Sequence, residues 1–186
     1  MKQAGVKNFF VICIAVIIGI FPISSYAATV SEIDASVNAS IERFVNEVKG
    51  AKEFLNAAKG VLIIPKVMQG GLIVGFEYGE GALRIGGKTV GYYNITSESF
   101  GAQIGGQEKD IIIVFMNKAV LKKFRTSEYW QTGVDAKVTV VNVGVDESLN
   151  TNTTKFKQPV VGFVFGQKGL MAGATIEGSK FSKLKK

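Results

Sequence analysis

The sequence predicts an α+β fold: a mainly antiparallel β-sheet, barrel-like in form, that follows an N-terminal amphipathic helix and includes one short internal helix. Three observations predict this class. Apolar and small residues recur every three or four positions between Val30 and Lys59, which is a helical period. After Gly60 the period changes to two, as in half-buried strands. Of the 186 residues, 47% are hydrophobic and 20% charged, which suits one globular domain with a sizeable core.

Residues 1–27 have the features of a secretory signal peptide. Lys2 and Lys7 give a positive start, Phe9–Phe21 is an apolar run, and Ser25-Tyr26-Ala27 places small residues where a signal peptidase reads. We therefore expect cleavage after Ala27 and an exported protein, periplasmic or secreted and peripherally membrane-associated. The alternative is a retained membrane anchor, but the run is shorter than the roughly 20 residues that a spanning helix needs.

Composition excludes most catalytic machinery from the expected mature chain. The only cysteine, Cys13, lies within residues 1–27, and the chain has no histidine. No disulfide, no Cys-His or Ser-His-Asp nucleophile and no zinc- or haem-type ligand set can then form. We expect a non-enzymatic protein without cofactor or metal. A hydrolase using a Ser-Lys or carboxylate pair stays open as an alternative, although no pattern marks one.

Residues 28–59 are expected to form an N-terminal helical segment. Ser31 with Asp34 resembles a capping box, Gly60 suits a C-terminal cap, and Gly50 can divide the helix in two. The amphipathic face has two interpretations: it docks on a membrane, or it packs on the protein's own sheet. Few large residues occur per turn, which favours packing on the sheet.

Residues 60–186 are expected to form the β-rich domain. A polar turn is expected after Pro65, a hairpin turn at Gly86-Gly87 and a further turn at Glu108-Lys109. Ile111–Phe115 is apolar on both faces, so it is expected to be a central strand. The strands expected up to the internal helix are Val61–Ile64, Leu72–Tyr78, Ala82–Ile85, Thr89–Ile95, Phe100–Gln107 and Asp110–Met116.

The rest of the chain holds the short internal helix and further strands. The helix is expected at Asn117–Arg125, capped by Asn117, with a turn at Tyr129-Trp130 after it. The segments that follow are a strand at Ala136–Val143, a polar loop at Asp146–Thr154, strands at Val160–Phe165 and Leu170–Ile176, and a basic tail at Lys180–Lys186.

The net charge favours an acidic partner. It is +7 for the whole chain and becomes +5 without Lys2 and Lys7, since residues 1–27 hold no acidic residue. Basic side chains cluster on the internal helix, where they can contact lipid phosphates; the alternative is an ordinary solvated helix face. Nucleic acid is a poor partner for an exported protein, and no aromatic-basic stacking pattern supports it.

Several motifs occur in a fixed order along the chain: Gly60–Val67, Tyr78–Leu83, Ser99–Gln107, Asp110–Asn117, Gly133–Ala136 and Gly169-Leu170 with Glu177-Gly178. This series resembles the SYLF-domain family, also called the yeast-type actin-binding domain family. The resemblance covers about Ala57 to Lys183 and is closest to exported bacterial members with a single domain. No cysteine stands at the expected mature start, so the chain departs from the lipid-anchored members.

The resemblance implies a non-enzymatic lipid-binding module of the cell envelope. It would bind anionic phospholipid or phosphoinositide-like headgroups through basic residues. The alternative is an envelope protein–protein interaction module, because some eukaryotic members bind actin. Lys66 matches a basic position of the family beside the turn expected after Pro65. The candidate lipid contacts are Lys66, Lys118, Lys122, Lys123, Arg125, Lys183 and Lys185.

Overall fold

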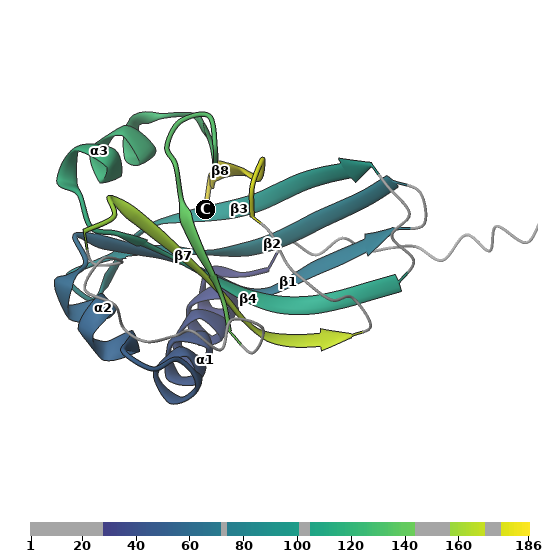
Figure 1. Cartoon of the computed structure of the whole chain (residues 1–186), viewed down its shortest axis with the longest axis horizontal. Helices are drawn as coiled ribbons and strands as arrows, with labels where there is room; N and C mark the ends of the chain where they lie inside the picture. Colours follow the sequence, from purple (N-terminus) through teal and green to yellow (C-terminus); the bar gives the residue numbers. More distant parts are fainter. Residues whose placement is uncertain (1–27, 72–73, 101–104, 144–156, 170–175) are drawn as a thin grey trace, which may run out of the picture.

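The structure is a computed structural model that describes residues 28–71, 74–100, 105–143, 157–169 and 176–186. Its centre is an eight-stranded sheet that curls into a half-barrel (Figure 1). The strand order is β5-β8-β3-β2-β1-β4-β7-β6, and all pairs are antiparallel except β6 with β7. The expected α+β class and barrel-like sheet are therefore confirmed. The predicted signal peptide and the polar loop at Asp146–Thr154 lie outside the described residues, as does most of the strand expected at Leu170–Ile176.

The elements follow one another in the order that the period change predicts. The helices are α1 (Val30–Glu47), α2 (Ala51–Ala57) and α3 (Lys118–Thr126). The strands are β1 (Gly60–Gly71), β2 (Val74–Ile85), β3 (Lys88–Phe100), β4 (Gly105–Phe115), β5 (Tyr129–Gln131), β6 (Thr139–Asn142), β7 (Val160–Gly169) and β8 (Lys180–Leu184).

The N-terminal helices cover one face of the sheet. Ile33, Val37 and Phe44 of α1 are buried against β1, β4 and β7, where Phe44 meets the ring of Phe163 edge-on with centroids 4.9 Å apart. The apolar face of the N-terminal helix is thus used in the protein's own core, as the low content of large residues favoured. Gly50, at φ 83°, separates α1 from α2, because this left-handed conformation interrupts a helix.

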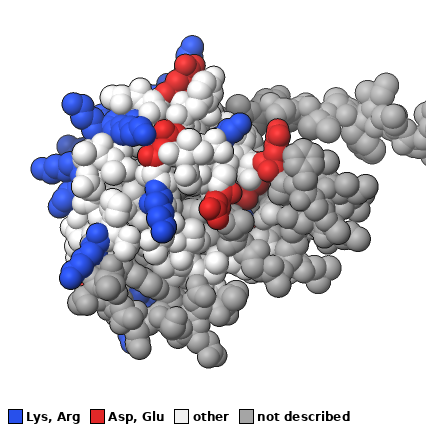
Figure 2. Space-filling model, turned by 45° about the horizontal axis from the view of Figure 1, so that its top comes forward, with Lys and Arg blue, Asp and Glu red and all other residues white. Residues whose placement is uncertain are grey.

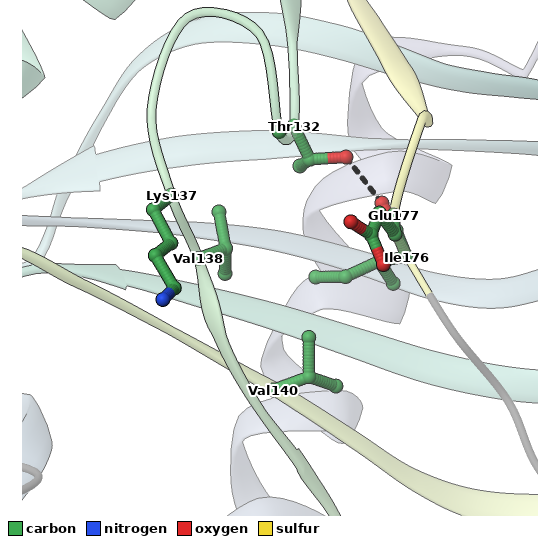
Figure 3. Close-up of a pocket in the computed structure, with 7 residues that line it drawn as sticks. Thr132, Lys137, Val138, Val140, Ile176 and Glu177 are labelled. Atoms are coloured by element: carbon green, nitrogen blue, oxygen red, sulfur yellow. Dashed lines mark hydrogen bonds between the residues drawn. The ribbon is translucent and has the colours of Figure 1, made fainter.

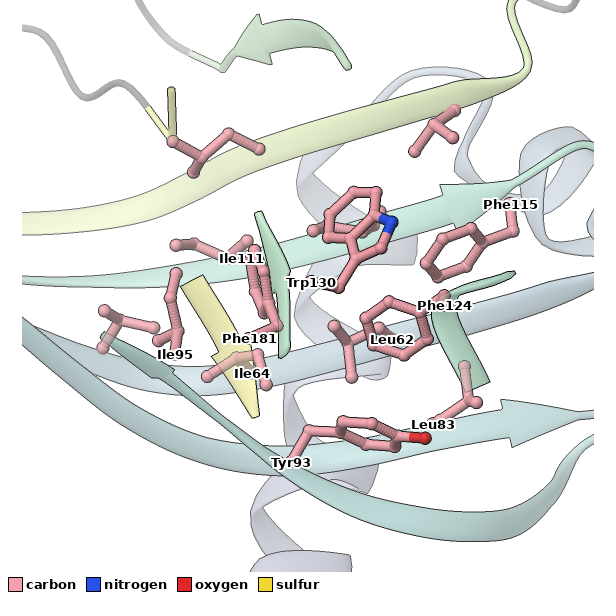
Figure 4. Packing of buried hydrophobic residues seen from close by; sticks show 14 of the residues in the cluster. Leu62, Ile64, Leu83, Tyr93, Ile95, Ile111, Phe115, Phe124, Trp130 and Phe181 are labelled. Carbon is pink, nitrogen blue, oxygen red and sulfur yellow. The ribbon is translucent and has the colours of Figure 1, made fainter. Parts of the chain in front are cut away.

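The opposite, concave face encloses a second core, which α3 helps to fill (Figure 4). Phe124 of α3 lies against Tyr93, Phe115 and Trp130, with ring centroids 4.8, 4.9 and 5.4 Å away. Phe181 of β8 packs on Trp130 from the other side, at 5.8 Å. One aromatic cluster therefore fastens α3, β5 and β8 to the central strands.

Two caps predicted for the N-terminal helices are wrong. The capping box of α1 joins Thr29 and Glu32, not Ser31 and Asp34: Glu32 accepts the Thr29 backbone N–H at 2.7 Å. The two hydrogen bonds from Thr29 hold the pKa of Glu32 below its usual range. Gly60 is not a cap, because α2 ends at Ala57 with Ala58 as its C-cap, and Gly60 already belongs to β1.

The expected turns at Pro65 and at Glu108-Lys109 are wrong. β1 continues through Pro65 with an irregular register between Ile64 and Val67. β4 continues through Glu108 and Lys109, where its register with β7 shifts between Glu108 and Asp110. The shorter strands expected between Val61 and Met116 are therefore four long ones. The hairpin turn at Gly86-Gly87 is confirmed, with φ angles of 57° and 78°.

Two expectations near the C-terminus are also wrong. Tyr129 and Trp130 form edge strand β5 rather than a turn, and the basic tail is strand β8. Phe181 anchors β8 because its side chain is buried, while Lys180 and Lys183 stay exposed. The strand expected at Ala136–Val143 is shorter and spans Thr139–Asn142.

A close approach of β1 and β2 explains the glycines of the first hairpin. A Cβ atom at Gly81 would lie 1.9 Å from the carbonyl oxygen of Ile63. No residue other than glycine can occupy that position without moving the neighbouring strand. The glycine-rich stretch is thus part of the scaffold.

Candidate functional site

The best-supported candidate site is the exposed side of α3. Asn117 begins the helix, because its side-chain oxygen accepts the backbone N–H groups of Ala119 and Val120 at 2.7 and 3.3 Å. Leu121 and Phe124 bury the other side of the helix in the concave core. This orientation exposes Lys118, Lys122, Lys123 and Arg125. Figure 2 shows Lys and Arg side chains gathered at the end of the molecule that carries α3.

One of these four cations already has a partner. Lys123 Nζ lies 3.2 Å from Asp135 Oδ1 and donates to the Asp135 carbonyl oxygen, also at 3.2 Å. The Gln131 backbone N–H, together with Lys123, lowers the pKa of Asp135. Among the described residues, no ion pair involves the side chains of Lys118, Lys122 and Arg125. These three are therefore free to meet an anion.

Strand β8 adds cations beside α3. Lys183 pairs across the sheet with Tyr93, whose ring packs on Phe124 of α3. Burial raises the pKa of Tyr93, and the positive charge of Arg125 partly offsets this rise. Lys185 is exposed just beyond β8. The structure thus brings Arg125 and Lys183 to a common side of the molecule.

Exposed apolar side chains lie beside this basic surface. No sequence pattern indicated that they would be exposed there. Val134 is 75% exposed in the turn that carries Asp135, the partner of Lys123. Tyr129, 65% exposed, follows α3 directly. Exposed apolar residues beside cations are typical of surfaces that meet a lipid interface. A short apolar side chain in a turn gives no periodic signal, so only its exposure reveals it.

Lys66 does not join the α3 surface. It lies on the helical side of the sheet, near the start of α1, with φ at 49° and an exposed side chain. Its backbone N–H donates to Asp110 Oδ1 at 2.9 Å. Asp110 also accepts Ser40 Oγ at 2.9 Å and the guanidinium of Arg43. The irregularity at Lys66 therefore serves a buried carboxylate that holds α1 to the sheet.

A buried ion pair occupies the concave side of the sheet. Lys109 is 0% exposed, and its Nζ lies 3.0 Å from Glu77 Oε2 and 3.1 Å from Gln69 Oε1. Gln107 Nε2 donates to the same Gln69 oxygen at 3.2 Å. Burial raises the pKa of Glu77, and Lys109 opposes that rise. The alternation that buries Ile111 and Ile113 also points to Lys109 and Gln107, but the wrong turn prediction concealed it.

The alternative of a hydrolase depends on a Ser-Lys or a carboxylate pair. Among the described residues, no serine hydroxyl hydrogen-bonds a lysine amine: Ser40 donates to Asp110, while Lys109 binds Glu77 and Gln69. No group of three or more Cys, Asp and Glu side chains is placed to hold a metal ion within the described parts of the chain. In those parts, no helix combines the length and apolar character needed to cross a membrane.

A small pocket lies where the chain crosses from β5 to β6 (Figure 3). Val138, Val140 and Ile176 form its apolar wall, and Lys137 and Glu177 lie at its polar rim. The Thr132 hydroxyl donates to the Ile176 carbonyl oxygen across it. Its volume of ≈ 180 Å³ is below the roughly 300 Å³ at which ligand pockets begin. The pocket thus lies where the chain connects the two edge strands of the half-barrel.

One comparison with known proteins identifies a relationship. Residues 96–186, from β3 to the C-terminus, match the family model Ysc84, described as Las17-binding protein actin regulator. The match contains α3, β8 and all candidate contacts except Lys66. No curated protein matches the chain.

Proposed function

Through residues 96–186 the chain belongs to the SYLF (Ysc84) family, and from this premise we propose that it binds anionic phospholipid at a membrane surface of the cell envelope. The family is associated with lipid or actin binding and is a binding-domain family rather than an enzyme family. The proposed contacts are Lys118, Lys122 and Arg125 of α3, with Lys183 and Lys185 beside them. We also propose that the protein is exported, either periplasmic or secreted, and peripherally membrane-associated.

The observation that carries this proposal is the division of α3 into a buried and a basic side. Leu121 and Phe124 fix the helix on the domain, so its cations are presented without the cost of ordering a free segment. Val134 extends from the same surface and can enter the headgroup layer, while the cations meet lipid phosphates. Lys66 is not a contact of this surface, since it lies on the other face of the sheet.

Co-sedimentation with vesicles tests the proposal. The mature protein should bind vesicles of phosphatidylglycerol and phosphatidylcholine, but not pure phosphatidylcholine, and binding should weaken as salt rises. Each basic residue near an anionic surface contributes about 1 kcal/mol. Replacing Lys122 and Arg125 by Gln should therefore weaken binding roughly 30-fold.

A matched variant controls for net charge. Lys49 and Lys52 are also exposed but lie at the start of α2, on the other face of the sheet. Replacing both by Gln removes the same charge and should change vesicle binding less than threefold. Equal losses in the two double variants, or binding that ignores lipid charge, would contradict the placement on α3.

An exposed apolar surface favours a protein partner as the second candidate function. Met68 and Tyr78 are cross-strand neighbours on β1 and β2, 55% and 44% exposed, and Phe76 is 60% exposed beside them. Replacing Phe76 and Tyr78 by Ser should then abolish capture of an envelope protein and leave vesicle binding intact. Retained capture by this variant would exclude this surface.

A further inference from the structure

A groove of ≈ 490 Å³ lies between the N-terminal helices and the β1–β2 hairpin. Its walls are apolar: Ile41 comes from α1, Leu55 from α2, and Val61 and Ile63 from β1. The side chains of Ile41 and Leu55 are only half-buried, so they keep apolar surface exposed toward the groove. The groove is on the helical face of the sheet, opposite α3, and the proposed membrane surface uses none of its residues.

Arg84 of β2 is the one charged residue that lines the groove in the described part of the chain. One of its terminal nitrogens, Nη2, donates to Asn38 Oδ1 at 2.7 Å. Its Nε is buried and has no hydrogen-bond partner among the described residues. The nearby Asp34 carboxylate instead accepts the hydroxyls of Thr89 and Tyr92, both at 3.0 Å. The other terminal nitrogen, Nη1, has no hydrogen-bond partner among the described residues and is not enclosed as Nε is, so it can donate to a carboxylate or phosphate.

The turn between β2 and β3 leaves one end of the groove open. Gly86 and Gly87 line it, both are exposed, and a Cβ atom added to either would meet nothing within 4 Å. Lys59 and Lys88, which adjoin lining residues in the sequence, are exposed as well. This end is thus accessible, and Asn56 and Arg84 are the two polar side chains among the described residues that line the groove.

We propose that this groove binds one monoacyl lipid with an anionic headgroup. The headgroup pairs with Arg84, and the acyl chain lies along the partly exposed Ile41, Leu55 and Ala58. An apolar wall beside a guanidinium that keeps one terminal donor unpaired matches an amphiphile rather than a free anion, which would leave the wall exposed to water. The volume lies within the range of small-molecule sites, which suits one chain. This inference does not depend on the proposed function.

Native mass spectrometry and calorimetry with monomeric lysophosphatidylglycerol test it. The mature protein should bind one molecule of this lipid. Lysophosphatidylcholine, with the same chain but no net charge, should bind at least tenfold more weakly. Glycerol 3-phosphate, which is the head without the chain, should not bind at millimolar concentration. Equal binding of the two lysolipids, binding of glycerol 3-phosphate as tight as that of the lipid, or several equivalent lipids per chain would overturn the proposal.

Variants locate the site. Arg84→Met should weaken lysophosphatidylglycerol binding at least tenfold and leave lysophosphatidylcholine binding unchanged. Asn38→Ala removes the Arg84–Asn38 hydrogen bond but keeps the charge, so it should retain binding and controls for the loss of that bond. Leu55→Asn should weaken both lysolipids, because it places a polar group against the chain. Unchanged binding in Arg84→Met, or an equal loss in Asn38→Ala, refutes the role of the Arg84 charge.

The α3 double variant separates this site from the membrane surface. Lys122→Gln with Arg125→Gln should still bind monomeric lysophosphatidylglycerol within twofold of the parent protein, although its vesicle binding is weakened roughly 30-fold. A parallel loss of monomer binding would show a non-specific response to positive charge and would overturn the groove. Failure of vesicle binding in the parent protein, with lysolipid binding intact, would refute the proposed function and leave the groove standing.

Discussion

The buried Lys109–Glu77 pair permits a double-mutant cycle with a defined outcome. Replacing Glu77 by Met leaves the Lys109 ammonium, which is 0% exposed, with Gln69 as its one remaining partner among those the structure describes. At a separation of 3.0 Å and an effective dielectric constant of about 20, the lost attraction is roughly 5–6 kcal/mol. Breaking buried pairs in proteins costs about 3–5 kcal/mol, so we expect Glu77→Met to reduce the free energy of unfolding by that amount.

The opposite single substitution, Lys109→Met, should destabilise the protein less in acid than at neutral pH. In Lys109→Met, Glu77 remains buried without its cation, and burial already raises the pKa of this carboxyl. A carboxyl whose pKa is raised by folding penalises the folded state only once it ionises. Its penalty is absent below the unfolded pKa of about 4.3 and grows as pH rises through the folded pKa. The deficit of Lys109→Met should therefore be largest at pH 7 and shrink toward pH 4.

The double variant Glu77→Met/Lys109→Met carries neither charge of this pair and should be within about 1 kcal/mol of the parent protein. Guanidinium unfolding is the assay, followed by the fluorescence of Trp130, the single tryptophan, which is 1% exposed in the concave core. The coupling energy should be several kcal/mol at pH 7. If the two single effects add within about 0.5 kcal/mol, or if the Lys109→Met deficit does not change with pH, the assigned pairing is refuted.

Two further predictions concern the scaffold. Asp110→Asn removes the charge that binds Arg43 and should reduce the free energy of unfolding by about 2–3 kcal/mol, measured by the same unfolding assay; a loss below about 0.5 kcal/mol would show that Asp110 does not hold α1. Gly81→Ala should destabilise the protein by about 3 kcal/mol or more, because its Cβ would meet the Ile63 carbonyl oxygen at 1.9 Å. Gly70→Ala, whose Cβ has no contact closer than 3.9 Å, should change thermal stability little. Equal effects of the two substitutions would contradict the close approach of β1 and β2.

Local patterns in the sequence predict much of the fold. The change of period after Gly60 separates the helices from the sheet, and Asn117 with Leu121 and Phe124 predicts α3, because a cap and an apolar side are encoded within a few neighbouring residues. The apolar run Ile111–Phe115 predicts a strand covered on both faces, and it lies between β1 and β7. In these cases short-range preference and burial agree.

The failures occur where distant parts of the chain decide the structure. Lys109 suggested a turn because a charged residue is expected at the surface, yet Glu77 on β2 provides its partner inside. Lys66 suggested a turn, yet Asp110 on β4 takes its backbone N–H. For the candidate site, the basic character of α3 is visible in the sequence. The position of Lys183 beside it depends on the pairing of β8 with β3, which no local pattern encodes.

The strand order also has a consequence for the order of folding. β1, β2 and β3 join neighbours through short connections, whereas β8 must find β3 after most of the intervening chain has been placed. Loop closure makes such distant pairing slow, so β8 should dock last, together with β5, its edge neighbour. Until then Trp130 lacks the cover of Phe181. A nascent chain whose final residues are still inside the ribosome would keep an open half-barrel. The fluorescence of Trp130 would then report when β8 has docked and the fold is complete.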